Sequence, residues 1–443
     1  MDVLPCGHVA RASRVRLCRH LLGPDGPPDD IEYVRVLTGR GIEYDLCCRT
    51  CDRAGTAPEL LVVCEGCAFR AEEDETGMVG WRGRPEIRER PEGHRGEPAR
   101  LRLPPALRRP LDWAALPGTD GAAYLFLTGR RDLVRFDALS GRFQRLATVS
   151  VPDDTVERPA RRVEISLRLR PHLHVSRSGR YAAVVNDHGS RGAVVDLRTG
   201  RTTMTLDGGH YGTHIMPFAL AFATHQGRDV MVHRTASNRL DVSDPATGDL
   251  LTARDATRQD DPEGRRGEHH LTYWHGALRI SPDGRWIADN GRLGYPGVGT
   301  TVWDLRRWLE ENPFESEDGP SRRSLCVRDY AWNRPVCWVS ESLVAVFGIG
   351  SDDETLLDGV RVFDASTGTE TLTFPGPSGD VLFADGRRLY SDGDEGLQIW
   401  DPSTGERTAS VPGFHPRRHH PRAAELAAIQ DGDLVRLPTA GRP

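Results

Sequence analysis

Four cysteines near the N-terminus have the spacing of a structural zinc site. They form two C-x2-C pairs with twelve residues between them: Cys48, Cys51, Cys64 and Cys67. Each C-x2-C turn can direct two thiolates at one ion, and two such turns complete the closed tetrahedral shell of structural zinc. We therefore predict that these four thiolates bind one zinc ion. A thioredoxin-type redox pair is the competing interpretation, but it requires a βαβ context that the first seventy residues do not show.

A second group of candidate ligands repeats a C-x-H step within the first twenty residues. It consists of Cys6, His8, Cys18 and His20. These residues could bind a second zinc ion by Cys2His2 ligation, although C-x-H places its ligands closer together than the C-x2-C turn does. Cys47 competes as a ligand for either site, and the alternative for the two histidines is that they are ordinary surface residues. The sequence predicts one structural zinc ion and leaves a second open.

The whole cysteine-rich segment, residues 1–75, is predicted to be a small zinc-ribbon-like domain. Seven of the nine cysteines lie there, whereas Cys326 and Cys337 stand alone in apolar surroundings downstream. In a chain without a secretion signal, clustered cysteines indicate metal binding rather than disulfides, because the cytosol keeps thiols reduced. Such a domain has a small core, so metal coordination would supply much of its folding free energy.

The basic residues of the chain are all arginine. There are 58 of them in 443 residues, and no lysine. Schiff-base enzymes, P-loop NTPases and protein kinases are excluded, because each needs a lysine side chain. The formal net charge of −6 argues against a general nucleic-acid-binding protein, whose affinity rests on clustered positive charge. One arginine- and proline-rich stretch, residues 76–110, is interpreted as a solvated linker.

The sequence carries no pattern for secretion or membrane insertion. The first twenty residues lack an apolar h-region. The longest apolar run, AAYLFL at 122–127, falls far short of the ~20 residues that a membrane helix needs. We expect a cytoplasmic protein that does not bind membranes.

One turn motif, D-x-x-[ST]-G or a close variant, recurs after short apolar runs in the rest of the chain. Six aspartates mark it: Asp137, Asp196, Asp244, Asp304, Asp364 and Asp401. The frame reappears in VRLPTAG, where Leu437 replaces the aspartate. Intervals of 36 to 60 residues between the units, together with their strand-like alternation, are typical of a β-propeller.

The turn aspartates are predicted to be structural rather than catalytic. The Asp side chain can accept hydrogen bonds from backbone amides of a tight turn, and the Gly takes a positive φ. Carboxylates at the same outer turn of every blade cannot converge on one substrate. A second phrase precedes several units, as in SPDGR at 281–285, and would reverse an inner strand into the next one.

At these residues the chain resembles the WD-repeat and related bacterial β-propellers. The Trp-Asp dipeptides at 303–304 and 400–401 and the segment at 281–285 carry the resemblance, which covers about residues 111–443. Most units lack the Trp, the Gly-His step survives only at 209–210, and the repeat lengths vary. The resemblance implies a propeller fold and leaves the partner undefined.

The repeats predict a mainly β chain in which a seven-bladed β-propeller over 111–443 follows the zinc-ribbon-like domain. We expect blades at about 111–150, 170–206, 215–253, 276–310, 335–375, 378–411 and 412–437. The last unit is too short for a fourth strand. The segment 99–106, which contains the alternation Arg-Leu-Arg-Leu, is therefore expected to close the ring and remove open sheet edges.

Three insertions between repeats are the expected functional surface: 153–166, 255–276 and 308–324. Loops on a rigid scaffold usually carry binding, and these hold arginine, acidic and aromatic residues of the kind found at interfaces. The favoured function is a non-enzymatic cytoplasmic scaffold or adaptor that binds other proteins through its propeller loops.

Two other functions stay open. A propeller hydrolase or lyase would place its site at the mouth of the central channel, where His172, His174 and His275 could converge. No GxSxG, HExxH or GxGxxG motif occurs, so no catalytic residue is proposed. Nucleic-acid recognition would use the zinc module with the linker arginines, and its affinity would fall steeply with salt.

Overall fold

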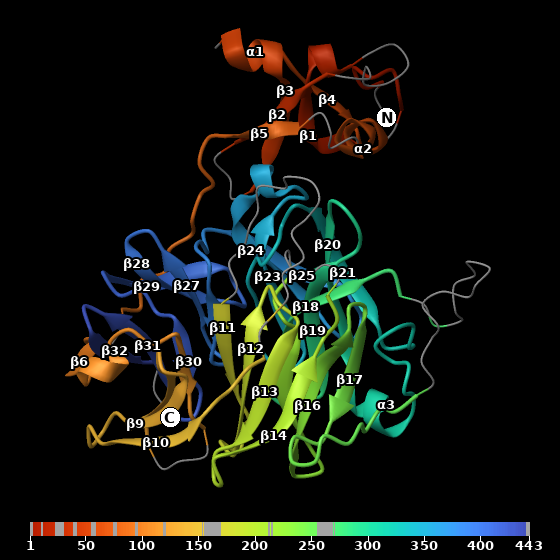
Figure 1. Cartoon of the computed structure of the whole chain (residues 1–443). Helices are drawn as coiled ribbons and strands as arrows, with labels where there is room; N and C mark the ends of the chain where they lie inside the picture. The colour runs from red at the N-terminus through yellow and green to blue at the C-terminus, as the bar shows by residue number, and fades with distance from the viewer. Residues whose placement is uncertain are drawn as a thin grey trace.

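A computed structural model describes most of the chain (Figure 1). The described residues are 3–9, 12–22, 31–38, 42–54, 59–73, 78–93, 96–117, 121–152, 154, 170–210, 213, 216–254, 269 and 271–439. The insertion predicted at 153–166 lies outside these residues except for Asp154, and so does most of the insertion at 255–276. No helix within these ranges is long and apolar enough to cross a membrane.

Seven antiparallel sheets follow one another around a ring, which confirms the prediction of a mainly β chain with a seven-bladed propeller (Figure 1). The first sheet contains β7 (Asp112–Ala115), β8 (Ala123–Leu127), β9 (Asp132–Asp137) and β10 (Phe143–Thr148). The second contains β11 (Arg170–Val175), β12 (Tyr181–Asp187), β13 (Arg191–Asp196) and β14 (Arg201–Asp207). The third has three strands, β15 (Leu220–His225), β16 (Arg228–Ala236) and β17 (Arg239–Ser243).

The next three sheets have four strands each. The fourth contains β18 (Trp274–Ile280), β19 (Trp286–Arg292), β20 (Gly297–Asp304) and β21 (Arg323–Asp329). The fifth contains β22 (Val336–Trp338), β23 (Leu343–Ile349), β24 (Leu357–Asp364) and β25 (Glu370–Pro375). The sixth contains β26 (Leu382–Ala384), β27 (Leu389–Gly393), β28 (Gly396–Asp401) and β29 (Glu406–Pro412).

The seventh sheet joins strands that are far apart in the sequence. It contains β30 (Arg418–His420), β31 (Glu425–Gln430) and β32 (Asp433–Pro438), and its fourth strand is β6 (Ala99–Arg102). β6 runs antiparallel to β32, with Leu101 opposite Leu434. Arg102 Nη1 adds a contact of 2.8 Å to Asp433 Oδ1. A strand that precedes the first sheet therefore completes the last one.

The turn aspartates have the structural role that the motif predicts. After β9, Asp137 Oδ1 accepts hydrogen bonds from the backbone amides of Leu139 and Ser140, both at 2.9 Å. Gly141 closes this turn with φ of 70°, a conformation that favours glycine. Equivalent side-chain to backbone bonds occur at Asp196, Asp244, Asp364 and Asp401. These carboxylates are occupied in building the turns.

The fourth sheet differs from the prediction, which ended this blade near residue 310 and placed an insertion after it. Its fourth strand is β21, so the segment 308–324 lies mostly inside the blade, between β20 and β21. The segment that connects them begins with helix α3 (Leu305–Glu310). Asp304 is the cause, because its Oδ1 accepts a hydrogen bond from Arg307 N at 3.1 Å and caps a helix instead of closing a tight turn.

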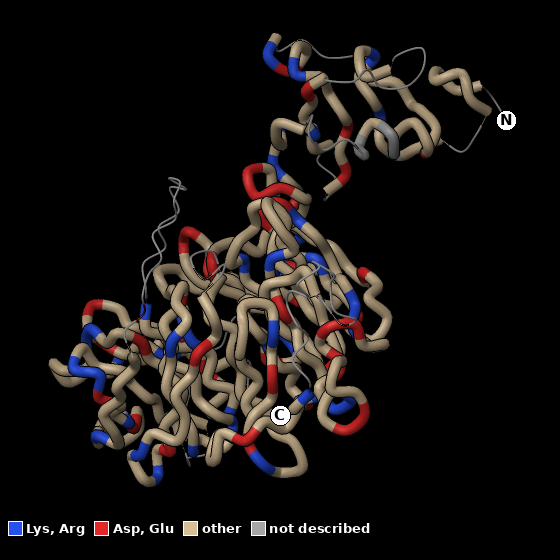
Figure 2. Tube along the Cα trace, turned by 45° about the vertical axis from the view of Figure 1, so that its right-hand side comes forward, with Lys and Arg blue, Asp and Glu red and all other residues tan. Residues whose placement is uncertain are grey.

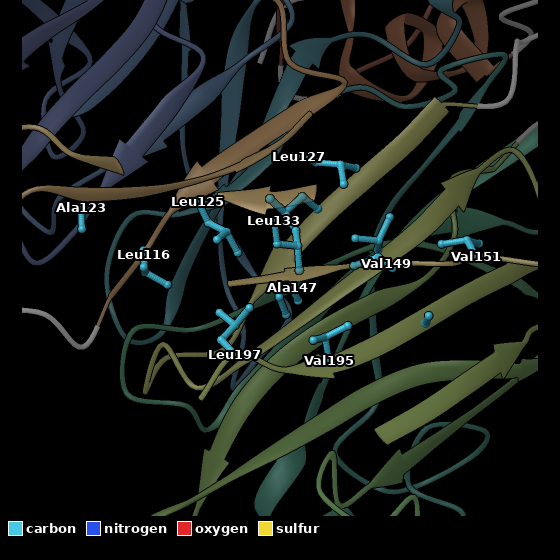
Figure 3. Packing of buried hydrophobic residues seen from close by; sticks show 14 residues of the cluster. Leu116, Ala123, Leu125, Leu127, Leu133, Ala147, Val149, Val151, Val195 and Leu197 are labelled. Atoms are coloured by element: carbon cyan, nitrogen blue, oxygen red, sulfur yellow. The ribbon is translucent and has the colours of Figure 1, made fainter. Parts of the chain in front are cut away.

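Apolar clusters fill the contacts between neighbouring sheets (Figure 3). In one cluster, Leu125 and Leu133 of the first sheet meet Leu173 and Val195 of the second, and all four are buried. Similar clusters lie at the other six contacts around the ring. Burying one such side chain contributes about 1.5–3 kcal/mol. Each sheet is therefore stabilised on both of its faces.

The N-terminal module is a five-stranded sheet with strand order β4-β1-β3-β2-β5. Its strands are β1 (Ala12–Cys18), β2 (Tyr33–Leu37), β3 (Tyr44–Cys48), β4 (Leu60–Cys64) and β5 (Met78–Arg82), and its helices are α1 (Arg49–Ala54) and α2 (Glu65–Glu73). Strand β5 lies within the segment interpreted as a linker. It joins this sheet beside β2, and Trp81 packs edge-on against Tyr44 at 5.4 Å between ring centroids.

The segment that follows β5 lies against the propeller rather than in solvent. Glu89 forms a β-bridge with Arg407 of β29, and Arg90 Nη2 lies 2.6 Å from Asp401 Oδ2. Charged residues of this segment thus find partners of opposite charge on the sixth sheet. The module itself lies at one end of the ring, near β24 (Figure 1).

Candidate metal centres

Centre A brings Cys6 and His8 together with Cys64 and Cys67. Cys64 ends β4, and Cys67 lies in the first turn of α2. The Sγ atoms of these two cysteines lie 3.7 and 3.4 Å from His8 Nδ1. Cys6 Sγ accepts a hydrogen bond from the backbone N of Cys64 at 3.4 Å. One candidate ligand atom from each residue lies within 4.8 Å of the other three.

Centre B combines Cys18 and His20 with Cys48 and Cys51. Cys18 ends β1, Cys48 ends β3, and Cys51 lies in α1. Cys18 Sγ is 3.8 Å from Cys48 Sγ and 3.9 Å from Cys51 Sγ. His20 Nδ1 lies 3.5, 3.6 and 3.3 Å from the sulfurs of Cys18, Cys48 and Cys51. These four ligand atoms also lie within 4.8 Å of one another.

The distances between ligand atoms fit a tetrahedral zinc ion. Zinc–sulfur bonds of about 2.3 Å and zinc–nitrogen bonds of about 2.0 Å place two sulfurs about 3.8 Å apart, and a sulfur and a nitrogen about 3.5 Å apart. The contacts of 3.3 to 3.9 Å in centre B agree with these values. They are much longer than a disulfide bond of about 2.05 Å. Each centre therefore has the donor set and spacing for one zinc ion.

The structure groups the ligands differently from the sequence prediction. The two C-x2-C pairs do not meet; each combines with one C-x-H step. Strand order is the reason, because β1 lies between β4 and β3. β1 is parallel to β3, so these two strands end side by side at centre B. β1 is antiparallel to β4, so the end of β4 at Cys64 lies opposite Ala12, the start of β1, at centre A.

Cys47, the competing ligand of the sequence prediction, belongs to neither group of four. Its side chain is buried, and its Sγ donates to the backbone carbonyl of Cys48 at 3.5 Å. Burial raises the pKa of the Cys47 thiol to about 11, and the neighbouring Cys18 and Cys48 add to this effect. A thiol is a poorer ligand than a thiolate, so the local environment disfavours metal binding by Cys47.

One cysteine in each centre has a pKa that favours the thiolate. Burial opposes ionisation of Cys6, but hydrogen bonds from the backbone at Cys64 and His8 outweigh it and lower the pKa to about 6. Burial likewise opposes ionisation of Cys18, and the backbone at His20 and Cys48 lowers its pKa to about 7. Because the thiolate is the form that binds metal, both centres hold a thiolate near neutral pH.

The histidines considered for a catalytic site do not converge. His172 and His174 of β11 stack with 4.4 Å between ring centroids. His275 is buried in the fourth sheet, where its Nδ1 lies 2.7 Å from Asp289 Oδ2. His172 Nδ1 lies 2.7 Å from Asp187 Oδ2. Burial opposes the charge on His172, but Asp187 outweighs it and raises the histidine pKa. Each of these carboxylates therefore serves a single imidazole.

Comparisons with known proteins add a structural likeness and no family. No family model and no curated protein sequence matches the chain. One matching chain comes from the crystal structure of the mitotic checkpoint complex. It has a TM-score of 0.46 and 15% sequence identity, and the match covers 79% of this chain and 100% of that chain. The assignment of the propeller therefore rests on the strand pairing described above.

Proposed function

We propose that this protein is a non-enzymatic cytoplasmic scaffold, in which two structural zinc ions fold the N-terminal module and the propeller presents loops to partner proteins. The observation that carries the proposal is the pair of centres with four protein ligands each. A closed shell of four protein ligands leaves no open position for water or substrate, which is the property of structural rather than catalytic zinc.

Contacts between the module and the propeller support an architectural role. Trp81 Nε1 donates to the carbonyl of Thr355, in the short 3-10 helix Asp353–Thr355, at 2.6 Å. Arg407 pairs with Glu89, and Arg388 pairs with Glu92. A module fixed at several points presents one surface together with the propeller, as a scaffold requires.

An aromatic surface beside the module supports binding to a protein. Tyr295 is 69% exposed and Tyr330 is 38% exposed. Their ring centroids lie 5.7 Å apart, and the Tyr330 ring lies 6.4 Å from that of Trp332. Tyrosine and tryptophan are enriched at protein interfaces. Asp329, next to Tyr330, forms a β-bridge with Asp352. Asp352 precedes the 3-10 helix that contacts the module. Figure 2 shows acidic residues where the propeller approaches the module.

The charge pairing in the module favours this function over nucleic-acid binding. Arginines of the module pair with nearby carboxylates: Arg16 with Asp45, Arg19 with Glu59, Arg49 with Glu32 and Arg82 with Asp52. A neutralised guanidinium contributes little to the counterion release that drives binding to phosphates. The linker arginines Arg90 and Arg102 are also paired, with Asp401 and Asp433.

The scaffold proposal is tested with the full-length protein. Native mass spectrometry is expected to find two zinc ions per chain. Crosslinked partners are then captured from the source cells with the wild type, with the double variant Tyr295→Ala/Tyr330→Ala, and with Leu139→Ala as a control. Leu139 is 71% exposed and lies in the turn after β9, so its change removes an exposed apolar side chain elsewhere.

We expect the wild type and Leu139→Ala to retain the same proteins and the double variant to lose them. An identical set from all three proteins would exclude the aromatic surface as the interface. A chain without bound zinc would contradict the structural-zinc proposal.

A further inference from the structure

The central channel of the propeller contains a cavity of about 1180 Å3. It is lined by the innermost strands of six sheets, which contribute among others Ala114, Leu173, Arg279, Cys337, Leu382 and Arg418. The volume is somewhat larger than the roughly 300–1,000 Å3 of typical sites for small molecules, so such a molecule would fit. Neither the metal centres nor the proposed scaffold surface makes use of this cavity.

Arg279 stands out among the cationic side chains of the cavity wall. It lies on β18, one residue before the strand ends. Its Nη1 donates to the carbonyl of the neighbouring Leu278 at 3.1 Å, and no carboxylate among the described residues forms an ion pair with it. The Arg279 side chain is exposed to the channel, but the protein atoms around it lower the pKa of the guanidinium through desolvation. A guanidinium held in this way is available to an anion.

Three other arginines that line the cavity have hydrogen-bonding or ionic partners. Arg418 pairs with Asp112, and Arg417 Nη1 lies 3.1 Å from Asp392 Oδ2. Arg177 donates to the backbone carbonyls of Ser281 and Pro282 at 2.7 and 2.8 Å. Carboxylates thus neutralise Arg417 and Arg418, whereas Arg177 and Arg279 have only carbonyl partners among the described residues and keep their charge.

The carboxylates of the cavity wall are not placed to neutralise Arg279. Asp385 is occupied by the Tyr390 hydroxyl at 2.7 Å and by two backbone amides of its own turn. Glu341 lies in the turn after β22, and Asp380 precedes β26. Both are exposed, and neither forms an ion pair with Arg279 in the part of the chain that the structure describes. Arg387 is also exposed and lies in the turn after β26. It is another cation of the cavity wall.

A second polar group near Arg279 is also without a partner. His174 Nε2 is buried and forms no hydrogen bond with the described residues. Burial lowers the pKa of His174 well below its ordinary value, and the charges of His172 and Arg279 act in the same direction. The neutral imidazole therefore has a nitrogen without a hydrogen-bond partner close enough to Arg279 to be influenced by its charge, but His174 itself does not line the cavity.

Apolar side chains complete the cavity. Leu173, Ile280, Val336, Leu382 and Phe383 line it together with the polar groups. Leu173, Val336 and Leu382 are already buried between sheets, but Ile280 and Phe383 are only half-buried. A molecule with an apolar body would remove these two side chains from water, which a hydrated inorganic ion would not do. The cavity thus combines partly apolar walls with cations that form no ion pair among the described residues, Arg279 among them.

We propose that the channel binds a small organic anion, which places a carboxylate or phosphate group against Arg279 and an apolar body against the half-buried side chains of Ile280 and Phe383. Arg279 is the group that carries specificity for charge, because a guanidinium can form two parallel hydrogen bonds with either oxyanion. This site is independent of the zinc centres and of the surface proposed for protein partners.

The experiment measures binding of simple probes to the zinc-loaded, full-length protein by calorimetry. Phenyl phosphate and benzoate carry the two candidate anionic groups on the same apolar body. Benzyl alcohol has the body without the charge, and inorganic phosphate has the charge without the body. We expect saturable binding of at least one of the two aromatic anions in the millimolar range or tighter, and weaker or no binding of the other two probes. Preference for one aromatic anion identifies the oxyanion.

Two substitutions locate the site, and a third serves as control. Arg279→Gln is expected to weaken binding by about tenfold or more, because a charge-assisted hydrogen bond is lost. Arg279→Lys keeps the cation and is expected to restore part of the affinity. Arg201→Gln, on the exposed outer strand β14, is expected to bind like the wild type. Without probe, Arg279→Gln should melt at or above the wild-type temperature, since it removes an unpaired cation.

The proposal is overturned if neither aromatic anion binds the wild type saturably, or if benzyl alcohol binds as tightly as they do. It is also overturned if Arg279→Gln, with an intact circular dichroism spectrum, retains full affinity. Should that variant not fold, partial retention of affinity by Arg279→Lys, together with discrimination among the four probes by the wild type, still supports the site. Lack of discrimination among the probes contradicts it.

Discussion

The module and the propeller differ in what fills their cores. In the module, Cys18, Cys48, Cys64 and Cys67 belong both to the buried core and to the candidate metal centres. In the propeller, an apolar cluster lies at every contact between neighbouring sheets. A short segment buries too little apolar surface to fold by itself, and a metal ion can supply the difference. A closed ring instead supports each sheet on two sides.

The largest expected effect is the unfolding of the module, but not of the propeller, when a metal ligand is removed. Cys18→Ser takes one ligand from centre B, and we expect one zinc ion to be lost together with the fold around it. Structural zinc is worth on the order of 10 kcal/mol to a small domain. Hydrogen exchange should rise sharply in β1 to β5 while β7 to β32 keep their protection, and native mass spectrometry should count the ions.

Cys47→Ser is the matched control for this prediction. It changes a buried cysteine next to Cys48 that lies outside both groups of ligands. This variant should keep two ions and normal exchange. Equal loss of zinc from the two variants, or an equal rise of exchange in the propeller, would contradict the division of the chain into a metal-dependent and a metal-independent part.

A smaller effect is expected when the ring is opened. Replacing Ala99–Arg102 by Gly-Ser-Gly-Ser keeps the chain length but removes the Leu101 side chain and weakens the four-residue pairing with β32. The lost burial and hydrogen bonds amount to about 4 kcal/mol of the free energy of unfolding of the propeller. Urea denaturation followed by tryptophan fluorescence measures this loss.

Arg100→Ser is the control for the ring-opening variant, because Arg100 is exposed on the same strand. It should change the free energy of unfolding by less than about 0.5 kcal/mol. Unchanged stability of the Gly-Ser variant would show that β6 adds nothing to the ring. Loss of zinc from that variant would show that the two regions are more strongly coupled than we infer.

The smallest expected effect is a loss of propeller stability at acidic pH, which a buried histidine would cause. His233 is 5% exposed, and its Nε2 lies 2.9 Å from Ser243 Oγ. Burial lowers the His233 pKa to about 4, from an ordinary value of about 6.5. As the pH falls from about 6.5 to about 4, the unfolded chain takes up a proton that the folded one resists. Stability that is present above this window is lost within it, on the order of 3 kcal/mol.

His233→Gln removes this titration while keeping a hydrogen-bonding side chain. We expect its propeller to be less stable near neutral pH but to show a flatter decline of the free energy of unfolding between about pH 6.5 and about pH 4. Denaturation curves across this range compare the two slopes. A slope identical to that of the wild type would mean that His233 is already protonated in the folded state or that its burial does not matter.

The sequence predicted the elements that local chemistry determines. The turn aspartates could be recognised because Asp137 and its counterparts need only the next few residues to form their hydrogen bonds. The pairing of metal ligands could not be recognised, because it depends on β1 lying between β4 and β3. Proximity along the chain had suggested that the two C-x2-C pairs would share an ion.

The sequence did not reveal two other features. In the fourth sheet, Asp304 caps α3, so a long connection rather than a tight turn leads from β20 to the fourth strand, β21. The Trp-Asp motif at 303–304 does not distinguish a helix cap from a tight turn. No motif in the sequence distinguishes Arg279 from the other arginines. Only the convergence of strands from six sheets shows that it faces a cavity and that neighbouring cations are already paired.

The pairing of β6 with β32 also has a consequence for protein synthesis. Arg102 and Asp433, which contact each other in this sheet, are 331 residues apart in the chain. At translation rates of about 5–20 residues per second, β6 leaves the ribosome on the order of tens of seconds before its partner exists. During that interval the six earlier sheets can form, but the ring stays open and two sheet edges are exposed. The N-terminal module emerges before the propeller, so metal ions could bind its two candidate centres while the propeller is still incomplete.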